Sequence, residues 1–104
     1  MTQIIYILSF ISLLTFSAYG QDITITQKDK KFSQKEIIVK KGQKITFIND
    51  DNLAHNVYTI VDGKKVDLGL QKAGESGELT FEDENTYRVR CAIHPRMKMI
   101  VKVE

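Results

Sequence analysis

The single cysteine of this 104-residue chain, Cys91, is followed closely by His94, Met97 and Met99, and the only other histidine is His55. A thiolate, an imidazole and a thioether within one short segment are side chains that bind soft metal ions. Copper in electron-transfer sites takes two imidazoles and one thiolate in a near-trigonal plane, with a long, weak thioether bond above it. The chain therefore contains every ligand type that such a copper site requires.

Each of these residues also has a simpler explanation. A single cysteine is often a small buried hydrophobic residue, and methionines fill gaps in cores. In an exported protein, however, a spare thiol is liable to oxidation, which makes a purely structural role for Cys91 less favourable. Zinc fits less well than copper, because one thiolate, two imidazoles and a thioether do not match the usual ligand sets of zinc.

Seven short segments rich in β-branched and aromatic residues predict the strands that must position these ligands. A tight turn at Gly42, which can take a positive φ, is expected to join two of them. No segment after Gly20 keeps a helical period for three turns, although 68–74 could hold one turn. We expect an all-β sandwich or barrel. The expected strands are 22–26, 36–40, 44–49, 55–61, 77–81, 86–91 and 99–104.

Two loops of this fold can bring the ligands together. Cys91 ends one expected strand and Met99 begins the next, so the segment between them can fold around one ion. His55 lies where the segment NDDNLAH leaves one expected strand and NVYTIV begins another. Loops at the same end of a sandwich can meet over a metal. Within the second loop, Asp50-Asp51 is interpreted only as polar.

The first twenty residues differ in composition from the rest. They carry no charge, and an apolar stretch from Ile4 to Phe16 is followed by the small residues of Ala18-Tyr19-Gly20. This pattern is typical of a helical secretory signal peptide cleaved after Gly20, although the usual basic residue near the start is missing. A retained membrane anchor is the alternative, but the apolar run is short for a span of about 20 residues. Either reading predicts export, to the periplasm or the outside of the cell.

Residues 21–104 have room for one domain with a marginal core. One cysteine cannot form an internal disulfide, so a bound metal is the other common way to stabilise an exported domain of this size. Every charged residue lies in this part, and its net charge of +2 is too small to indicate nucleic-acid binding. The segment KDKK, at 28–31, is expected to be a solvent-exposed turn.

These segments together resemble the cupredoxins, the type 1 (blue) copper proteins, and most closely their amicyanin and plastocyanin branches. The resemblance covers EIIVKKGQKITFIND, NDDNLAHNV, Tyr87 and CAIHPRM. It implies a Greek-key β-sandwich at 21–104, one type 1 copper ion held by His55, Cys91, His94 and a methionine, and one-electron transfer between Cu(II) and Cu(I). The chain departs from many relatives at Arg90, where they have an aromatic residue, and at Asp83-Glu84-Asn85, where they have a Pro-Gly turn.

The resemblance leaves two methionines for the axial position. Amicyanin has two residues between its loop histidine and its methionine, which selects Met97, and plastocyanin has four, which selects Met99. Pro95 matches amicyanin, and Met99 would alternate with Val101 on one face of the last strand. We expect Met97 to be the axial ligand and Met99 a core residue, with Met99 as the alternative.

The family also implies how the site would meet other molecules. Asn56, next to His55, would tie the two ligand loops together through its backbone N–H and its side chain, and Asn49 is a weaker candidate for such support. The exposed edge of His94 would be the electron port, with Arg96 and Lys98 adding positive charge for an acidic or haem-bearing redox protein. An apolar patch would surround the port, formed by Leu53, Ala54, Ile93 and Pro95.

Other functions use the same residues. A carrier or buffer that delivers copper without redox turnover is the main alternative to an electron carrier. An enzyme is not expected, because four protein ligands leave no open coordination position for a substrate. A metal-free sandwich would make the ligand set a coincidence, and the default expectation for the oligomeric state is a monomer.

Overall fold

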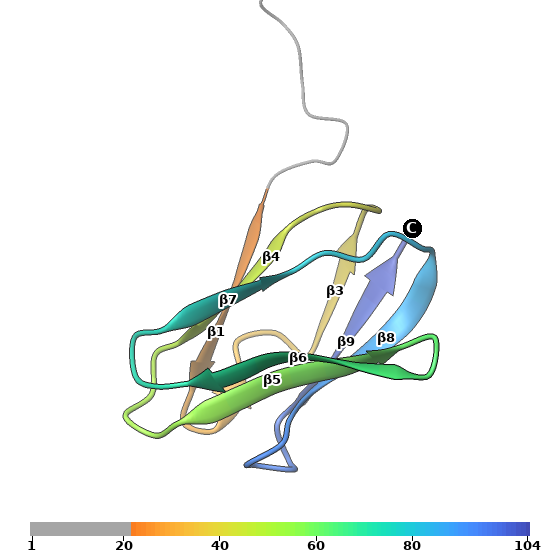
Figure 1. The fold of residues 1–104 in the computed structure, drawn as a ribbon. Coiled ribbons are helices and arrows are strands. Elements are labelled where there is room, and N and C mark those ends of the chain that lie inside the picture. Colours follow the sequence, from red (N-terminus) through yellow and green to blue (C-terminus); the bar gives the residue numbers. More distant parts are fainter. Residues whose placement is uncertain (1–21) are drawn as a thin grey trace, which may run out of the picture.

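The computed structural model describes residues 22–104, which form nine β-strands and no helix. The strands build two sheets, and the β8–β9 loop lies at the lower end of the molecule (Figure 1). The predicted all-β class and Greek-key sandwich are confirmed. The helical signal segment predicted at 1–20 lies outside the described residues. Within the described part of the chain, no helix has the length and apolar character needed to cross a membrane.

The first sheet has four strands in the order β2-β1-β4-β7. β1 and β4 run parallel, whereas β2 and β7 pair antiparallel with them. Alternate residues of the two central strands, including Ile25, Ile45 and Phe47, are fully buried, as a period of two predicts. The strands are β1 (Ile23–Lys28), β2 (Lys31–Phe32), β4 (Ile45–Asn49) and β7 (Ser76–Leu79).

The second sheet has five strands in the order β3-β9-β8-β5-β6. β3 and β9 run parallel, and the other pairs are antiparallel. Val57, Val89 and Val101 point into the core between the sheets and are fully buried. The strands are β3 (Glu36–Val39), β5 (His55–Val61), β6 (Lys64–Gln71), β8 (Asn85–Cys91) and β9 (Lys98–Val103).

The turn predicted at Gly42 is present, with a positive φ of 78°, and it links β3 to β4. These two strands belong to different sheets, so the turn carries the chain from one sheet to the other. The helical turn considered for 68–74 is wrong, because Leu68 to Gln71 continue strand β6. β6 and the two-residue β2 are the strands that the sequence reading missed.

The pairing of β5 with β8 decides where the ligands meet. The two strands are antiparallel, and Val57 lies opposite Cys91. The start of β5 therefore lies beside the end of β8, and the loop from β8 to β9 closes over the same end. At the other end of β8, Tyr87 stacks on Phe81 and donates a hydrogen bond from its hydroxyl to the carbonyl of Asp83.

Candidate metal centre

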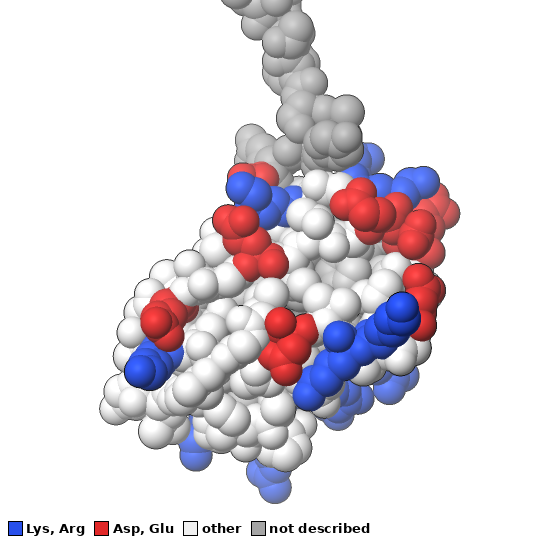
Figure 2. Space-filling model, in the orientation of Figure 1, with Lys and Arg blue, Asp and Glu red and all other residues white. Residues whose placement is uncertain are grey.

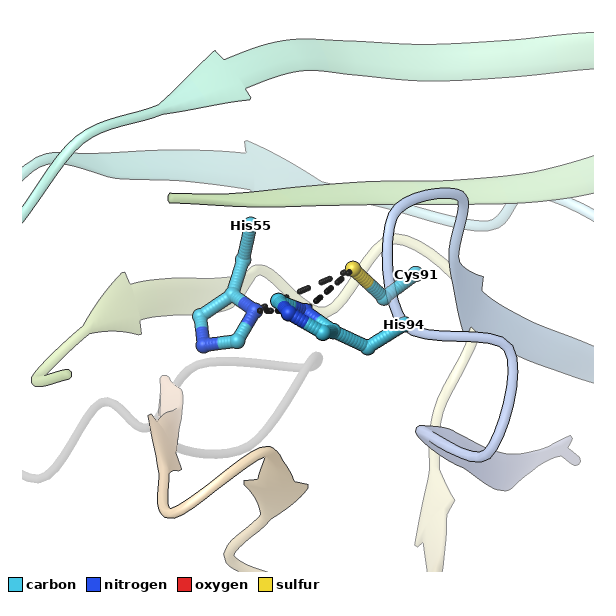
Figure 3. Close-up of side chains that lie close together, drawn as sticks. All are labelled: His55, Cys91 and His94. Carbon is cyan, nitrogen blue, oxygen red and sulfur yellow. Dashed lines mark hydrogen bonds between the residues drawn. The ribbon is translucent and has the colours of Figure 1, made fainter. Parts of the chain in front are cut away.

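Three of the predicted ligands converge at one end of the sandwich (Figure 3). His55 is the first residue of β5, Cys91 is the last residue of β8, and His94 lies in the loop to β9. Their ligand atoms all lie within 4.8 Å of one another. Because β5 and β8 are neighbours, residues far apart in the sequence reach one point without any long excursion of the chain.

The spacing of these atoms fits one metal ion. Nδ1 of His55 lies 3.0 Å from Nδ1 of His94, and Sγ of Cys91 lies 3.8 Å from each of them. A point equidistant from all three atoms is about 2.1 Å from each, close to the ~2.0–2.3 Å bonds that imidazole and thiolate ligands make to zinc, taken as a guide for copper. The donor set and its geometry both suit copper in a near-trigonal plane.

Asp51, which the sequence reading set aside as a polar loop residue, is a direct partner of His55. Its Oδ2 lies 2.7 Å from Nε2 of the ring, and both side chains are almost fully buried. An ionised carboxylate only accepts hydrogen bonds, so Nε2 of His55 carries a proton, and in the neutral ring Nδ1 then keeps its lone pair. Such a bond fixes both the tautomer and the orientation of a metal-binding histidine.

A tight turn holds Asp51 in place. The backbone N–H groups of Asp29 and Lys30 each donate to its carboxylate at 3.0 Å. Both turn residues have positive φ, 53° and 58°, which aims their consecutive N–H groups at one anion. The Lys30 N–H and the His55 ring are the main reasons that the pKa of Asp51 falls to about 2. The KDKK segment is a turn, as expected, but it also supports the site.

The two histidines differ in exposure. His55 is 0% exposed, whereas His94 is only partly buried at the loop surface. Burial, followed by the nearby His55 and Lys30, lowers the pKa of His94 below its usual value. The lowered pKa favours the neutral ring, which is the form that binds a metal.

Cys91 is held by the strand that carries His55. The backbone N–H of Asn56 lies 3.3 Å from Sγ of Cys91, and the carbonyl of Asn56 accepts a bond from the N–H of Ala92. The backbone of Asn56 thus joins the two ligand segments, as the resemblance implied. Its side-chain amide instead donates to Asp67 on β6, so the expected tie through the side chain is not present.

Met97 and Met99 are both buried, at 1% and 2% exposure, but they lie beside different positions along β8. The N–H of Met97 donates to the carbonyl of His94, and its own carbonyl accepts from the N–H of Cys91. Met99 pairs across the sheet with Val89, two residues farther from the ligand end of β8. Met97 therefore lies at the level of the cluster, and Met99 lies in the core beneath it.

Asn49, the last residue of β4, is a buried polar residue that is bonded to the loop leading to His55. The side-chain amide of Asn49, which is fully buried, donates to the carbonyls of Leu53 and Gln71. Asn49 also accepts from the N–H of Asp51, so it shapes the loop that leads to His55. Leu53 and Ile93 of the expected apolar patch are 42% and 46% exposed. The prediction that Asn49 supports the site is in keeping with these bonds.

Comparisons with known proteins agree with this geometry. Residues 20–104 match the model of the copper-binding proteins of the plastocyanin/azurin family. Amicyanin of Paracoccus denitrificans is 35% identical over 77 residues, which are 71% of this chain and 59% of that protein. A chloroplastic plastocyanin of Arabidopsis thaliana is 32% identical over 104 residues, 88% of this chain and 61% of that protein. The chain thus spans about three fifths of these relatives.

A solved structure shows the same likeness in three dimensions. An amicyanin variant in its Cu(I) form superimposes with a TM-score of 0.75 and is 28% identical. The superposition covers 80% of this chain and 82% of that one.

Proposed function

The chain belongs to the plastocyanin/azurin family of copper-binding proteins, and on this premise we propose that it is an exported one-electron carrier between redox partners. The cofactor is one copper ion of type 1. The observation that carries the proposal is the convergence of one sulfur and two imidazole nitrogens on a point about 2.1 Å from each.

We assign the equatorial ligands to His55, Cys91 and His94. The assignment is supported by the free lone pair on Nδ1 of His55, which the bond to Asp51 leaves directed at the cluster. It is also supported by the N–H of Asn56, which points at Sγ of Cys91. Hydrogen bonds of this kind stabilise thiolate charge and tune the potential of a copper–thiolate site.

Met97 is the proposed axial ligand. Its backbone bonds to His94 and Cys91 hold it level with the cluster, and its side chain is almost fully buried. Met99 remains the alternative, but its pairing with Val89 places it deeper in the core. A thioether from the metal loop would supply the long, weak fourth bond that distinguishes electron-transfer copper sites.

The protein would contribute to electron transfer by holding a set of mostly buried ligands in a fixed arrangement. Bound copper supplies the one-electron couple, Cu(II)/Cu(I). The residues around it keep the ligands in one arrangement: Asp51 fixes the ring of His55, and Asn56 joins the two ligand segments. A preorganised site needs little rearrangement when the charge changes, which favours fast transfer.

The partly exposed ring of His94 is the proposed port for the electron. Leu53 and Ile93, both well exposed, would give a partner a small apolar surface, and such small contacts suit brief redox encounters. We propose an acidic or haem-bearing redox protein as the partner, with Arg96 and Lys98 beside the port. Export to the periplasm or cell exterior is proposed from the uncharged apolar segment at 1–20.

A non-enzymatic role follows from the same ligand set, because four protein ligands would leave no open position for a substrate. The competing function is copper delivery without redox turnover. It predicts binding of Cu(I) without a stable Cu(II) state, whereas an electron carrier must give a reversible couple.

Absorption and EPR spectra after addition of Cu(II) test the proposal. We expect an intense visible band from the copper–thiolate bond and a reversible couple in voltammetry. Cys91→Ser should abolish the band, Met97→Ala should keep it but shift both spectra and the potential, and Met99→Ala should leave them nearly unchanged. A band that survives Cys91→Ser would refute the site, and reversed effects of the two methionine variants would make Met99 the axial ligand.

A further inference from the structure

A groove of about 580 Å³ lies beside the metal loop on the flank of the second sheet. β3 and β9 are parallel, and Glu36, the first residue of β3, pairs with Ile100. Lys98 and Met99, at the start of β9, therefore have no partner on β3. The chain that leads into β3 forms the facing wall, and Phe32 and Ile100 contribute apolar lining. A volume of this size falls in the range of sites that take ligands of several hundred cubic ångströms.

Among residues 22–104, seven basic side chains and no acidic one line the groove. Lys30, Lys31 and Lys35 line the wall before β3, and all three arginines of the chain lie on the other wall. Figure 2 shows acidic side chains over the upper and middle parts of the face drawn, whereas the lower edge, near the β8–β9 loop, shows only basic ones. Positive charge is therefore concentrated in the groove, although the net charge of the chain is small.

The arrangement of these cations is unfavourable for the isolated fold. Arg90 on β8 lies directly opposite Lys98 on the neighbouring antiparallel strand β9, and like charges in that position destabilise a sheet. Among the described residues, no cation of the groove forms an ion pair. Outside the groove, four lysines form ion pairs, each within 4.0 Å of an acidic side chain: Lys41, Lys44, Lys65 and Lys102.

We infer that this groove is a docking slot for an acidic segment of the redox partner, an inference that rests on the proposed electron-carrier function. Carboxylates of the segment would neutralise the unpaired cations, and its aliphatic parts would lie against the partly exposed side chain of Ile100. Arg96 and Met97 belong to both the groove and the metal loop. A segment bound here therefore lies against the loop that carries His94 and orients the partner toward the port.

Other polyanions fit the groove less well. A flat membrane surface contacts only the rim of a groove, so it would not reach Arg90, which is half-buried on the groove wall. Single-stranded nucleic acid binds largely by stacking bases on exposed aromatic rings. Phe32 is the only aromatic residue in the lining, and it is only 8% exposed.

Binding of fluorescein-labelled hexaglutamate, followed by fluorescence anisotropy at low salt, tests the inference. We compare Lys31→Glu/Lys35→Glu in the groove with Lys40→Glu/Lys64→Glu, which makes the same charge change at exposed lysines outside it. We expect the groove variant to weaken binding about tenfold or more and the control to weaken it less than about twofold. Lys31→Gln/Lys35→Gln should give an intermediate loss.

Equal losses in the two Glu variants, or no loss in either, would overturn the inference, since net charge alone would then explain binding. Competition by inorganic phosphate, phosphatidylglycerol vesicles or oligothymidylate that is stronger than by the peptide would overturn the acidic segment as occupant. Voltammetry of the same copper-loaded variants separates the two proposals. An absent reversible couple with intact peptide binding refutes the electron carrier, whereas a normal couple with unselective binding refutes only the slot.

Discussion

His55 and His94 offer the same nitrogen atom to the metal from opposite environments. His55 is fully buried at the start of a central strand, and its second nitrogen is bound to Asp51. His94 lies in a loop and is partly exposed. The difference indicates that His55 fixes the geometry of the ligands, whereas His94 is accessible to a partner.

The largest expected effect comes from removing each ring. Both His55→Gly and His94→Gly should lose the copper–thiolate band. Added imidazole should restore most of it in His94→Gly, because the vacated position opens to solvent, and little in His55→Gly, because that position is closed. Titration with imidazole, followed by absorption, measures this. Equal rescue of both variants would remove the distinction between the two rings.

The second prediction concerns the hydrogen bonds that Asp51 makes. Asp51→Asn should weaken copper binding about 10–100-fold, the usual effect of losing such a supporting contact. It should also lower the unfolding free energy of the metal-free protein by about 1.5–3 kcal/mol, because the lost bonds involve a charged group. Chelator competition and chemical denaturation measure the two effects.

Asp50→Asn is the matched control for that variant, since Asp50 is an exposed neighbour of Asp51. It should change neither quantity by much. If Asp50→Asn and Asp51→Asn behaved alike, the contact with His55 would have no special role.

The third prediction tests the support behind the buried histidine at low pH. Asp67 accepts bonds from the N–H of Gly69 and the amide of Asn56, and these lower its pKa. A lowered pKa stabilises the folded state above the unfolded value near 4, and the benefit is lost as pH falls below it.

Asp67→Asn should therefore destabilise the metal-free protein near neutral pH by less than about 1 kcal/mol, since the side chain is 37% exposed and water screens its charge. Denaturation curves of both proteins should converge below about pH 4. A difference that grows as the pH falls would contradict this assignment.

The smallest expected effect comes from the turn that holds Asp51. Lys30 has a φ of 58°, which is unfavourable for a residue with a Cβ by about 1–2 kcal/mol. Lys30→Gly relieves that strain but adds freedom to the unfolded chain. The net gain in stability should be about 0.5–1 kcal/mol by thermal denaturation. The backbone N–H that binds Asp51 is kept, so copper affinity should stay the same.

Much of the fold could be predicted from residue patterns, and the misses have physical causes. Strand β6 was missed although Val66, Leu68 and Leu70 alternate with polar or small residues; its burial pattern shifts near Gly69, so that Leu70 is exposed and Gln71 is buried. That glycine has a φ of 81° and lies at a bulge between β5 and β6. The Asp62-Gly63 pair before β6 was the available signal, since such a pair with positive φ at both residues is typical of a hairpin turn. β2, with two residues, is too short to give a pattern.

The supporting contacts of the site were harder to predict than its candidate ligands. Asp51 lies four residues before His55 in a loop, where spacing alone does not decide which side chains touch. Its other partners, Asp29 and Lys30, come from the β1–β2 turn, which meets that loop only because β1 pairs with β4. The basic groove likewise joins segments that are far apart in the chain.

By itself, the sequence determined the kinds of atoms available to a metal and the strand-forming character of the segments around them. Those are properties of single side chains and of short repeating patterns. Three features depend on the folded chain: the contact of Asp51 with His55, the position of Met99 opposite Val89, and the gathering in one groove of seven cations that form no ion pair with any other described residue. Each of these depends on which strands pair and in which register, and strand pairing is a property of the whole chain.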